Sequence, residues 1–230
     1  MTLRVALDID GVLADFRRAF RETGEQVAGR TDGGDAAMNA REVKRTWHAI
    51  GRTPQWWMGL RAYEPDQIER LYRVSRERRW EVYFLTTRPP SAGETPQFQT
   101  QWWLETQGFK LPAVLTVPGS RGDVANALRL DVLVDDRLVN CMEVIAASKT
   151  KAIFLDRDND LTAREQALSR GIAVVPTLRE ALDAVVALEA AMHAARGPLA
   201  RLADWFRSAP PDASLPADPR ETMPLGDETE

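Results

Sequence analysis

The amino-acid sequence predicts an α/β fold in which helices flank an open parallel sheet. Three short apolar runs, at residues 3–8, 81–85 and 131–134, have the length of buried strands. Each run ends in polar or acidic residues, and helical patterns alternate with such runs along the chain. That alternation favours parallel strands joined by right-handed crossovers. Ligands bind beyond the carboxyl ends of such strands, so the polar residues there form the candidate site.

The elements after the first strand follow from periodicity and from turn residues. Helices are expected at 16–27 and 40–50, separated by a glycine-rich loop at 29–35. That loop lacks the Gly-Lys-Ser/Thr ending of a phosphate-binding loop. Asp15 precedes the first helix and is expected to cap it. The elements nearer the sheet are helices at 66–79, 100–108, 123–130 and 162–170, and strands at 113–117, 151–155 and 172–175.

These elements divide the chain into four expected parts. The α/β core comprises residues 1–15 and 65–180, and a helical insertion occupies 16–64. A helical region at 181–207 has apolar positions that could cover a sheet face or a partner subunit, so a homo-oligomer formed through it stays open. Residues 208–230 carry five prolines and many acids and are expected to be disordered.

Bulk properties narrow the class of protein. The 230 residues carry a formal net charge of −4, which argues against a dedicated nucleic-acid binder. The single cysteine, Cys141, excludes an intramolecular disulfide, fits a reducing compartment and is expected to be a buried thiol. Residues 1–7 form a strand rather than a signal sequence, and the helix at 181–195 contains Asp183 and Glu189. We therefore expect a cytoplasmic protein with no membrane partner and no nucleic-acid partner.

Two pairs of carboxylates stand at strand ends. Asp8 and Asp10 follow the first strand, and Asp135 and Asp136 follow the strand at 131–134. Charges beside a buried strand are costly unless they are paired, so catalysis or metal binding explains them better than an acidic turn does.

These residues form an ordered set. The pattern Asp8-x-Asp10-Gly-Val-Leu, then Thr86 after a strand, then a basic residue, then Asp135-Asp136 resembles the haloacid dehalogenase superfamily of phosphohydrolases. The resemblance covers roughly residues 3–180. It implies a Rossmann-like parallel sheet of the haloacid dehalogenase type, with a small helical cap inserted after the first strand.

A narrower resemblance concerns the substrate. The run DIDGVLADF from Asp8 to Phe16, the pair Thr86-Thr87 and the run Asp135-Asp136-Arg137 resemble the 5′(3′)-deoxyribonucleotidase family. The stretch 56–71 is similar to that family's return from cap to core.

The superfamily resemblance implies roles for the acidic residues. Asp8 would be the nucleophile that forms an aspartyl-phosphate, and Asp10 would be the general acid and base. Mg²⁺ would be bound by Asp8, Asp135 and the Asp10 carbonyl. Asp136 would order metal-bound water or the loop, with direct ligation as the second alternative. Thr86 would bind the phosphoryl oxygens, and its neighbour Thr87 could be a second donor; a local backbone bond is the alternative.

The superfamily also requires a basic residue before the last acidic pair. Arg121 is the candidate, although the family more often has lysine there, and Lys110 and Lys149 are alternatives. Arg88 could contact the substrate or form a salt bridge. Arg137 could pair with the acidic residue beside it.

Aromatic residues could determine the substrate specificity, because a nucleobase binds to flat apolar surfaces. Phe16, Trp47, Trp56 and Trp57 are candidates for stacking, and packing of the cap on the core is the alternative for the tryptophans. The two tryptophans of the helix at 100–108 are expected in the core.

Within the predicted helix at 66–79, every third residue from position 70 onward is an arginine. Glutamates interleave with these arginines, so a solvated helix face is favoured over a nucleic-acid surface.

Together these observations predict a phosphoric monoester hydrolase of the 5′-nucleotidase type. Its substrate would be a small phosphomonoester, most plausibly a (deoxy)nucleoside monophosphate, and its cofactor Mg²⁺. A phosphatase of sugar phosphates or of nucleic-acid ends is the enzymatic alternative. A non-catalytic binding module is the alternative of another class, although such a scaffold would usually have lost Asp8, Asp10 or Asp135.

Overall fold

A six-stranded parallel sheet forms the centre of the fold. The computed structural model describes residues 2–29 and 38–195 of the chain. The strand order is β3-β2-β1-β4-β5-β6, and each neighbouring pair is parallel, as predicted. The strands are β1 (Arg4–Asp8), β2 (Glu81–Thr86), β3 (Ala113–Thr116), β4 (Val132–Asp135), β5 (Lys151–Leu155) and β6 (Ala173–Val175).

Helices connect the strands in chain order. They are α1 (Phe16–Ala28), α2 (Ala40–Arg52), the short 3₁₀ helix η1 (Trp56–Gly59), α3 (Pro65–Arg78), α4 (Pro96–Thr106), α5 (Arg121–Leu128), α6 (Leu138–Ala147), α7 (Leu161–Ser169) and α8 (Leu178–Ala195). The sequence analysis missed α6 and η1. Neither helix has a side-chain cap at its start, so neither carries the local signal found at the start of α1, α2, α4, α5 and α7.

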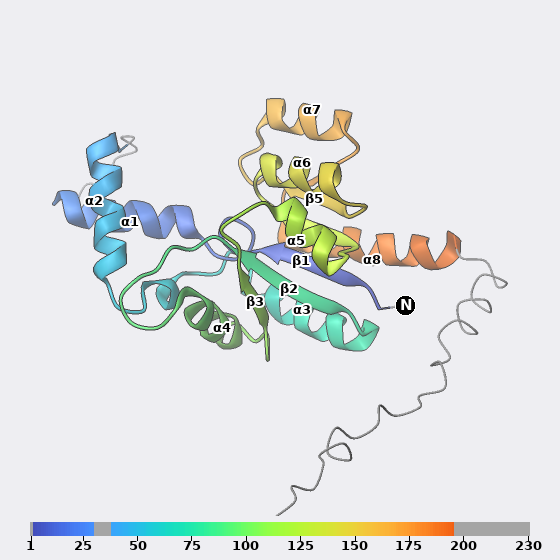
Figure 1. The fold of residues 1–230 in the computed structure, drawn as a ribbon, viewed down its shortest axis with the longest axis horizontal. Coiled ribbons are helices and arrows are strands. Elements are labelled where there is room, and N and C mark those ends of the chain that lie inside the picture. Colours follow the sequence, from blue (N-terminus) through green and yellow to red (C-terminus); the bar gives the residue numbers. More distant parts are fainter. Residues whose placement is uncertain (1, 30–37, 196–230) are drawn as a thin grey trace, which may run out of the picture. The chain divides into compact units, whose positions relative to one another are not determined.

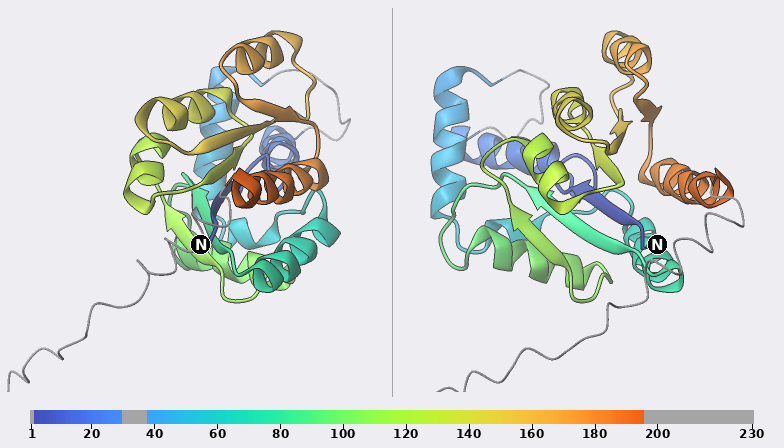
Figure 2. Two further views of the ribbon diagram at one scale, coloured as in Figure 1. Left: turned by 90° about the vertical axis from the view of Figure 1, so that its right-hand side faces the viewer. Right: turned by 45° about the vertical axis from the view of Figure 1, so that its right-hand side comes forward.

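The helices cover both faces of the sheet. On one face Ala125 of α5 and Val144 of α6 join Ala6, Leu85 and Leu133 of the strands in one buried cluster. α3 and the first part of α8 lie on the opposite face, where Arg70 pairs with Asp183 (Figure 2). Because both faces are covered, the central strands are continuously apolar, which made them detectable in the sequence.

The insertion between β1 and β2 begins with two helices that cross each other (Figures 1 and 2). α1 and α2 lie beyond the carboxyl end of β1 (Figure 1). The side chain of Asp15 accepts a hydrogen bond from the Arg18 backbone N–H at 3.1 Å, which confirms the predicted cap. Gly24 lets the two helices approach, because a Cβ there would lie 2.4 Å from the Met38 sulfur. The domain boundaries stay a prediction.

The expectation that both tryptophans of α4 lie in the core is wrong for one of them. Trp103 is fully buried and donates its indole N–H to the Leu60 carbonyl at 2.7 Å, whereas Trp102 is 45% exposed. Adjacent helical residues point about 100° apart, so one face of α4 buries only one of the pair. Cys141 is buried as expected, and burial raises the pKa of its thiol.

The remaining sequence predictions concern the C-terminal helix, membrane-spanning segments and the two segments predicted to be irregular. The compact unit that contains the sheet ends at Ala187, within α8. Within residues 2–29 and 38–195 no helix is long and apolar enough to cross a membrane. Most of the loop predicted at 29–35, and the tail predicted at 208–230, lie outside the described residues.

Candidate active site

The ends of three neighbouring strands meet at one cavity of about 410 Å³. Asp8 at the end of β1 and Thr86 at the end of β2 line it, and Asp136 follows β4. Asp135, the last residue of β4, is fully buried. Since β1 lies between β2 and β4, the polar residues that end these strands come together as expected for a parallel sheet.

The turn after β1 packs tightly on the loop after β4. Gly11 has a φ of +95°, and a Cβ there would lie 1.9 Å from an Asp136 carboxylate oxygen, so only glycine fits. Arg157 donates hydrogen bonds to the carbonyls of Gly11 at 3.1 Å and Val12 at 2.8 Å. The Arg157 guanidinium also stacks on the Tyr63 ring, 4.1 Å from its centroid. Arg157 thus anchors this turn from the end of β5, a role for which the sequence carried no signal.

Arg121 is the basic residue that reaches Asp8. Its Nη2 donates to Asp8 Oδ1 at 2.7 Å, and its Nε lies 3.9 Å from Asp135 Oδ2. The side chain is 4% exposed, and its Nε and Nη1 have no hydrogen-bond acceptor in the described chain. The two alternatives, Lys110 and Lys149, are exposed. Of the three candidates from the sequence, Arg121 is therefore the one that contacts Asp8.

Burial is the main cause of the raised pKa values of three carboxylates at the cavity. Burial, followed by the charge of Asp135, raises the pKa of Asp8, while Arg121 lowers it. Burial raises the pKa of Asp135 to about 6, and burial with the Asp135 charge raises that of Asp136 to about 7. Asn140 donates to both oxygens of Asp135, at 3.0 and 2.9 Å. Asn140 was missed because it lies on α6, which was itself missed.

Arg88 forms a salt bridge, one of the two alternatives open from the sequence. Its Nε and Nη2 donate to the Asp10 carboxylate at 3.0 and 2.7 Å, and its Nη1 donates to Thr100 Oγ1 at 2.9 Å. Its guanidinium carbon lies 4.9 Å from the centroid of the Trp57 ring. The Arg88 side chain is fully buried and holds Asp10 at the cavity.

The strand-end threonines and Arg137 also line the cavity. Thr86 is buried, and its hydroxyl lies 3.4 Å from the Arg88 backbone N–H, whereas Thr87 is exposed. The ion pair of Asp136 is with Arg17 at 3.9 Å, and not with Arg137 as expected. The backbone N–H of Arg137, the residue before α6, instead donates to Asp135 at 2.8 Å, and the Arg137 side chain is exposed.

Aromatic rings form one wall of the cavity. Phe16 stacks on Trp47 and on Trp57, with centroids 5.7 and 6.0 Å apart, and all three rings line the cavity. Trp57 is buried, while Trp47 is 37% exposed. Trp56 contacts Phe16 edge-on at 6.1 Å and packs behind this wall. Phe20, which the sequence analysis did not single out, supports Trp47 at 5.0 Å.

The sheet and its helices match solved hydrolases. A haloacid dehalogenase-like family hydrolase from Streptococcus pneumoniae superposes with a TM-score of 0.51 at 10% identity, over 80% of this chain and 98% of that one. The fold is that of the haloacid dehalogenase-like hydrolases.

Two further structures are similar over most of their length. A phosphonoacetaldehyde hydrolase-like protein from Oleispira antarctica has a TM-score of 0.48 at 15% identity, covering 87% of this chain and 94% of that one. A haloacid dehalogenase-like hydrolase from Xanthomonas campestris has a TM-score of 0.47 at 16% identity, covering 82% and 96%. No family model matches the sequence, and no curated protein does.

The cavity at the ends of β1, β2 and β4 has the donors for a hard divalent cation. In residues 2–29 and 38–195 no three His, Cys, Asp or Glu side chains converge as a preformed metal site. Asp8 and Asp135, however, are buried carboxylates, and burial is the main cause of their raised pKa values. Carboxylate oxygens are ligands of the kind that Mg²⁺ prefers, and Asp10 and Asp136 line the same cavity. The residues present therefore fit a cation at this edge of the sheet.

Proposed function

We propose that this protein is a Mg²⁺-dependent phosphomonoesterase that uses Asp8 as its nucleophile. The observation that carries the proposal is the pairing of Asp8 with the Arg121 guanidinium at the cavity, where Nε and Nη1 of Arg121 have no acceptor among the described residues. Buried donors without partners are costly, and a phosphoryl group bound against Asp8 would satisfy them. Arginine suits this role because its planar fork matches the geometry of phosphate oxygens.

The proposed chemistry has two steps on the same carboxylate. An Asp8 oxygen attacks phosphorus, the bond from phosphorus to the alcohol oxygen breaks, and Asp10 gives that oxygen its proton. Asp10 then takes a proton from the water that attacks the aspartyl-phosphate, which releases inorganic phosphate and restores Asp8. A Mg²⁺ ion held by Asp8, Asp135 and the Asp10 carbonyl would neutralise charge on the phosphoryl oxygens.

The aromatic wall supports a nucleoside as the alcohol. Phe16, Trp47 and Trp57 present flat apolar surface to the cavity that contains Asp8. A nucleobase buries such surface well, whereas a sugar phosphate offers mainly hydroxyl groups. We therefore propose a (deoxy)nucleoside monophosphate unit as substrate. The assembled carboxylates favour this over a non-catalytic module.

A panel of phosphomonoesters tests the proposed function. Phosphate release is measured with Mg²⁺ on ribo- and deoxynucleoside 5′- and 3′-monophosphates and on common sugar phosphates, with a chelator as control. We expect the highest kcat/KM on nucleoside monophosphates. Faster turnover of sugar phosphates would refute the nucleoside assignment, and no turnover of any ester would refute the phosphatase.

Mg²⁺ should stabilise the protein more strongly at pH 8 than at pH 5. The pKa values of Asp135 and Asp136, about 6 and about 7, exceed the ordinary value near 4, so the folded state holds protons that the unfolded state releases. These bound protons stabilise the folded state. Their contribution is complete below about pH 4 and is lost as the pH rises through 6 and 7. A cation replaces those protons. At a Mg²⁺ concentration near 100 times Kd and pH 8 we expect Tm to rise by about 5–10 °C.

The measurement is thermal unfolding with and without Mg²⁺ at both pH values. Asp135→Asn should remove most of the shift, whereas Asp66→Asn, an exposed carboxylate on α3, should leave it intact. An equal shift at pH 5 and pH 8 would contradict the assignment.

Arg88 should matter most for substrates whose leaving group needs a proton. Because Arg88 holds both oxygens of Asp10, we expect Arg88→Lys to lower kcat for alkyl phosphates by about 100-fold, within the range typical of general acid catalysis. p-Nitrophenyl phosphate, whose phenolate leaves without protonation, should lose less than about tenfold.

The ratio of kcat for alkyl phosphates to kcat for p-nitrophenyl phosphate distinguishes two causes of lost activity. Misplacement of Asp10 changes the ratio, whereas loss of folded protein lowers both rates equally. Thr100→Val, which removes the other hydrogen-bond partner of Arg88, should change the ratio in the same direction but less. Arg137→Gln, at the cavity but away from Asp10, is the matched control. Equal losses on both esters would contradict this role.

A further inference from the structure

Helix α2 concentrates positive charge in a chain whose net charge is −4. Its exposed basic side chains are Arg41, Lys44, Arg45, His48 and Arg52, here called the α2 basic face. The one acidic residue of the helix, Glu42, is engaged in the capping box with Asn39. In the described part of the chain, no ion pair neutralises any member of the α2 basic face.

The spacing of these positive charges lowers the stability of α2. Arg41 lies three residues before Lys44 and four before Arg45. Like charges at these spacings are neighbours on a helix surface and destabilise it by a few tenths of a kcal/mol per pair. The exposed arginines of α3 differ, because Asp66, Glu69 and Glu77 interleave with them.

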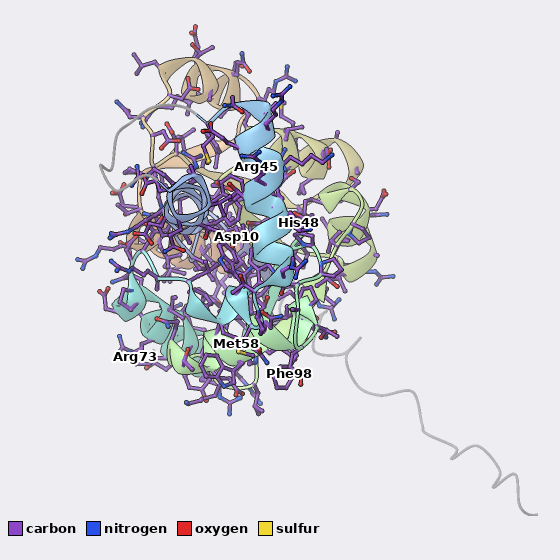
Figure 3. All side chains as sticks on the ribbon, turned by 90° about the vertical axis from the view of Figure 1, so that its left-hand side faces the viewer. Asp10, Arg45, His48, Met58, Arg73 and Phe98 are labelled. Atoms are coloured by element: carbon purple, nitrogen blue, oxygen red, sulfur yellow. The ribbon has the colours of Figure 1, made fainter. Side chains whose placement is uncertain are left out.

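The α2 basic face continues from the aromatic wall. Trp47 comes from α2, lines the cavity and is 37% exposed, so the helix reaches the cavity mouth. Lys44 lies one helical turn before Trp47 on the same side of the helix, and His48 is adjacent. In Figure 3 Arg45 and His48 lie on α2, while Arg73 of α3 is at another part of the surface.

We propose that the α2 basic face binds the phosphodiester backbone of a single nucleic-acid strand whose terminal phosphate lies in the cavity. A basic track beside aromatic rings is the arrangement with which proteins hold single strands, since the track pairs with phosphates and the rings stack on bases. The positions from Arg41 to Arg52 span about 16 Å of helix, room for several nucleotides. A single strand fits better than a duplex, because its terminal base is free to leave its neighbours and stack on the wall.

This inference rests on the proposed function, because the terminal residue of a strand is itself a nucleoside monophosphate unit. It also revises the expectation from the net charge. A local surface charge, and not the total, determines the attraction of a polyanion.

The first test compares a 5′- and a 3′-phosphorylated ten-nucleotide oligo(dT) with the corresponding thymidine monophosphates, in kcat/KM. At 50 mM salt we expect the better oligonucleotide to exceed its mononucleotide by at least tenfold. Four lysine and arginine contacts to phosphates of a single strand imply a loss of about 50-fold in strand affinity between 50 and 200 mM salt. The mononucleotide should lose far less.

Matched double variants locate the effect. Lys44→Gln with Arg45→Gln should lower the ratio of oligonucleotide to mononucleotide kcat/KM about tenfold and reduce the salt slope by about 1.4. Arg73→Gln with Arg76→Gln removes the same charge from α3 and should leave the ratio unchanged. Glutamine has the helix propensity of lysine and arginine, so both helices should stay folded.

A binding measurement tests the strand site independently of the proposed phosphatase activity. Anisotropy of a fluorescein-labelled, phosphorylated oligo(dT) is measured with full-length Asp8→Asn protein, which requires no turnover. Salt-sensitive binding that the α2 variant weakens and the α3 variant does not would support the strand site even in an enzyme of another activity. Turnover of mononucleotides at least as fast as of oligonucleotides at low salt would overturn the strand site and leave the phosphatase intact.

Discussion

Asp8→Asn should lower kcat by about 10⁴-fold or more, because it removes the atom that attacks phosphorus. The asparagine has nearly the shape of the aspartate, so the loss should occur in a folded protein. Burial already disfavours the charge of Asp8, as its raised pKa indicates, so the metal-free variant should unfold at a temperature no lower than the parent.

Two measurements test this prediction: mass spectrometry of the phosphorylated enzyme and the turnover rate of the variants. Mass spectrometry of acid-quenched enzyme should reveal one phosphoryl adduct on the peptide containing Asp8 in the parent protein and none in the variant. Asp123→Asn, an exposed carboxylate in the first turn of α5, is the matched control and should retain full turnover. Turnover by Asp8→Asn at the parent rate would refute the proposed mechanism.

Arg121→Met should lower kcat/KM by about 10²- to 10³-fold, since it removes donors aimed at charge that develops on the phosphoryl oxygens. It should also destabilise the metal-free protein by about 3–5 kcal/mol, because Asp8 and Asp135 would lose their buried cation. Mg²⁺ should then raise Tm more in the variant than in the parent, as it would supply the missing charge.

The conservative variant separates charge from shape. Arg121→Lys keeps a positive charge but offers a single ammonium in place of a planar fork, so it should recover part of the stability and less of the activity. Lys110→Met, at the exposed alternative from the sequence, should change neither. Full activity in Arg121→Met would show that another residue binds the phosphoryl group.

Much of the fold was predictable because its signals are local. β1, β2 and β4 are covered on both faces and are therefore short continuous apolar runs, and the residues that end them are visible as breaks in hydrophobicity. Asp15 was recognisable as a cap from its position alone. α6 was not, because the residue before it, Arg137, provides no side-chain cap.

The sequence by itself determined the parallel sheet and which polar residues lie at its carboxyl edge, since strand period and strand ends are properties of neighbouring residues. Only the tertiary structure decided the partner of each charge. Arg121 and Asp8 are 113 residues apart, and Arg88 and Asp10 are 78 apart. The same holds for the α2 basic face, whose charges are visible in the sequence but whose place beside the cavity depends on how the insertion packs against the sheet edge. Pairing over such separations depends on how distant elements pack, which no local pattern contains.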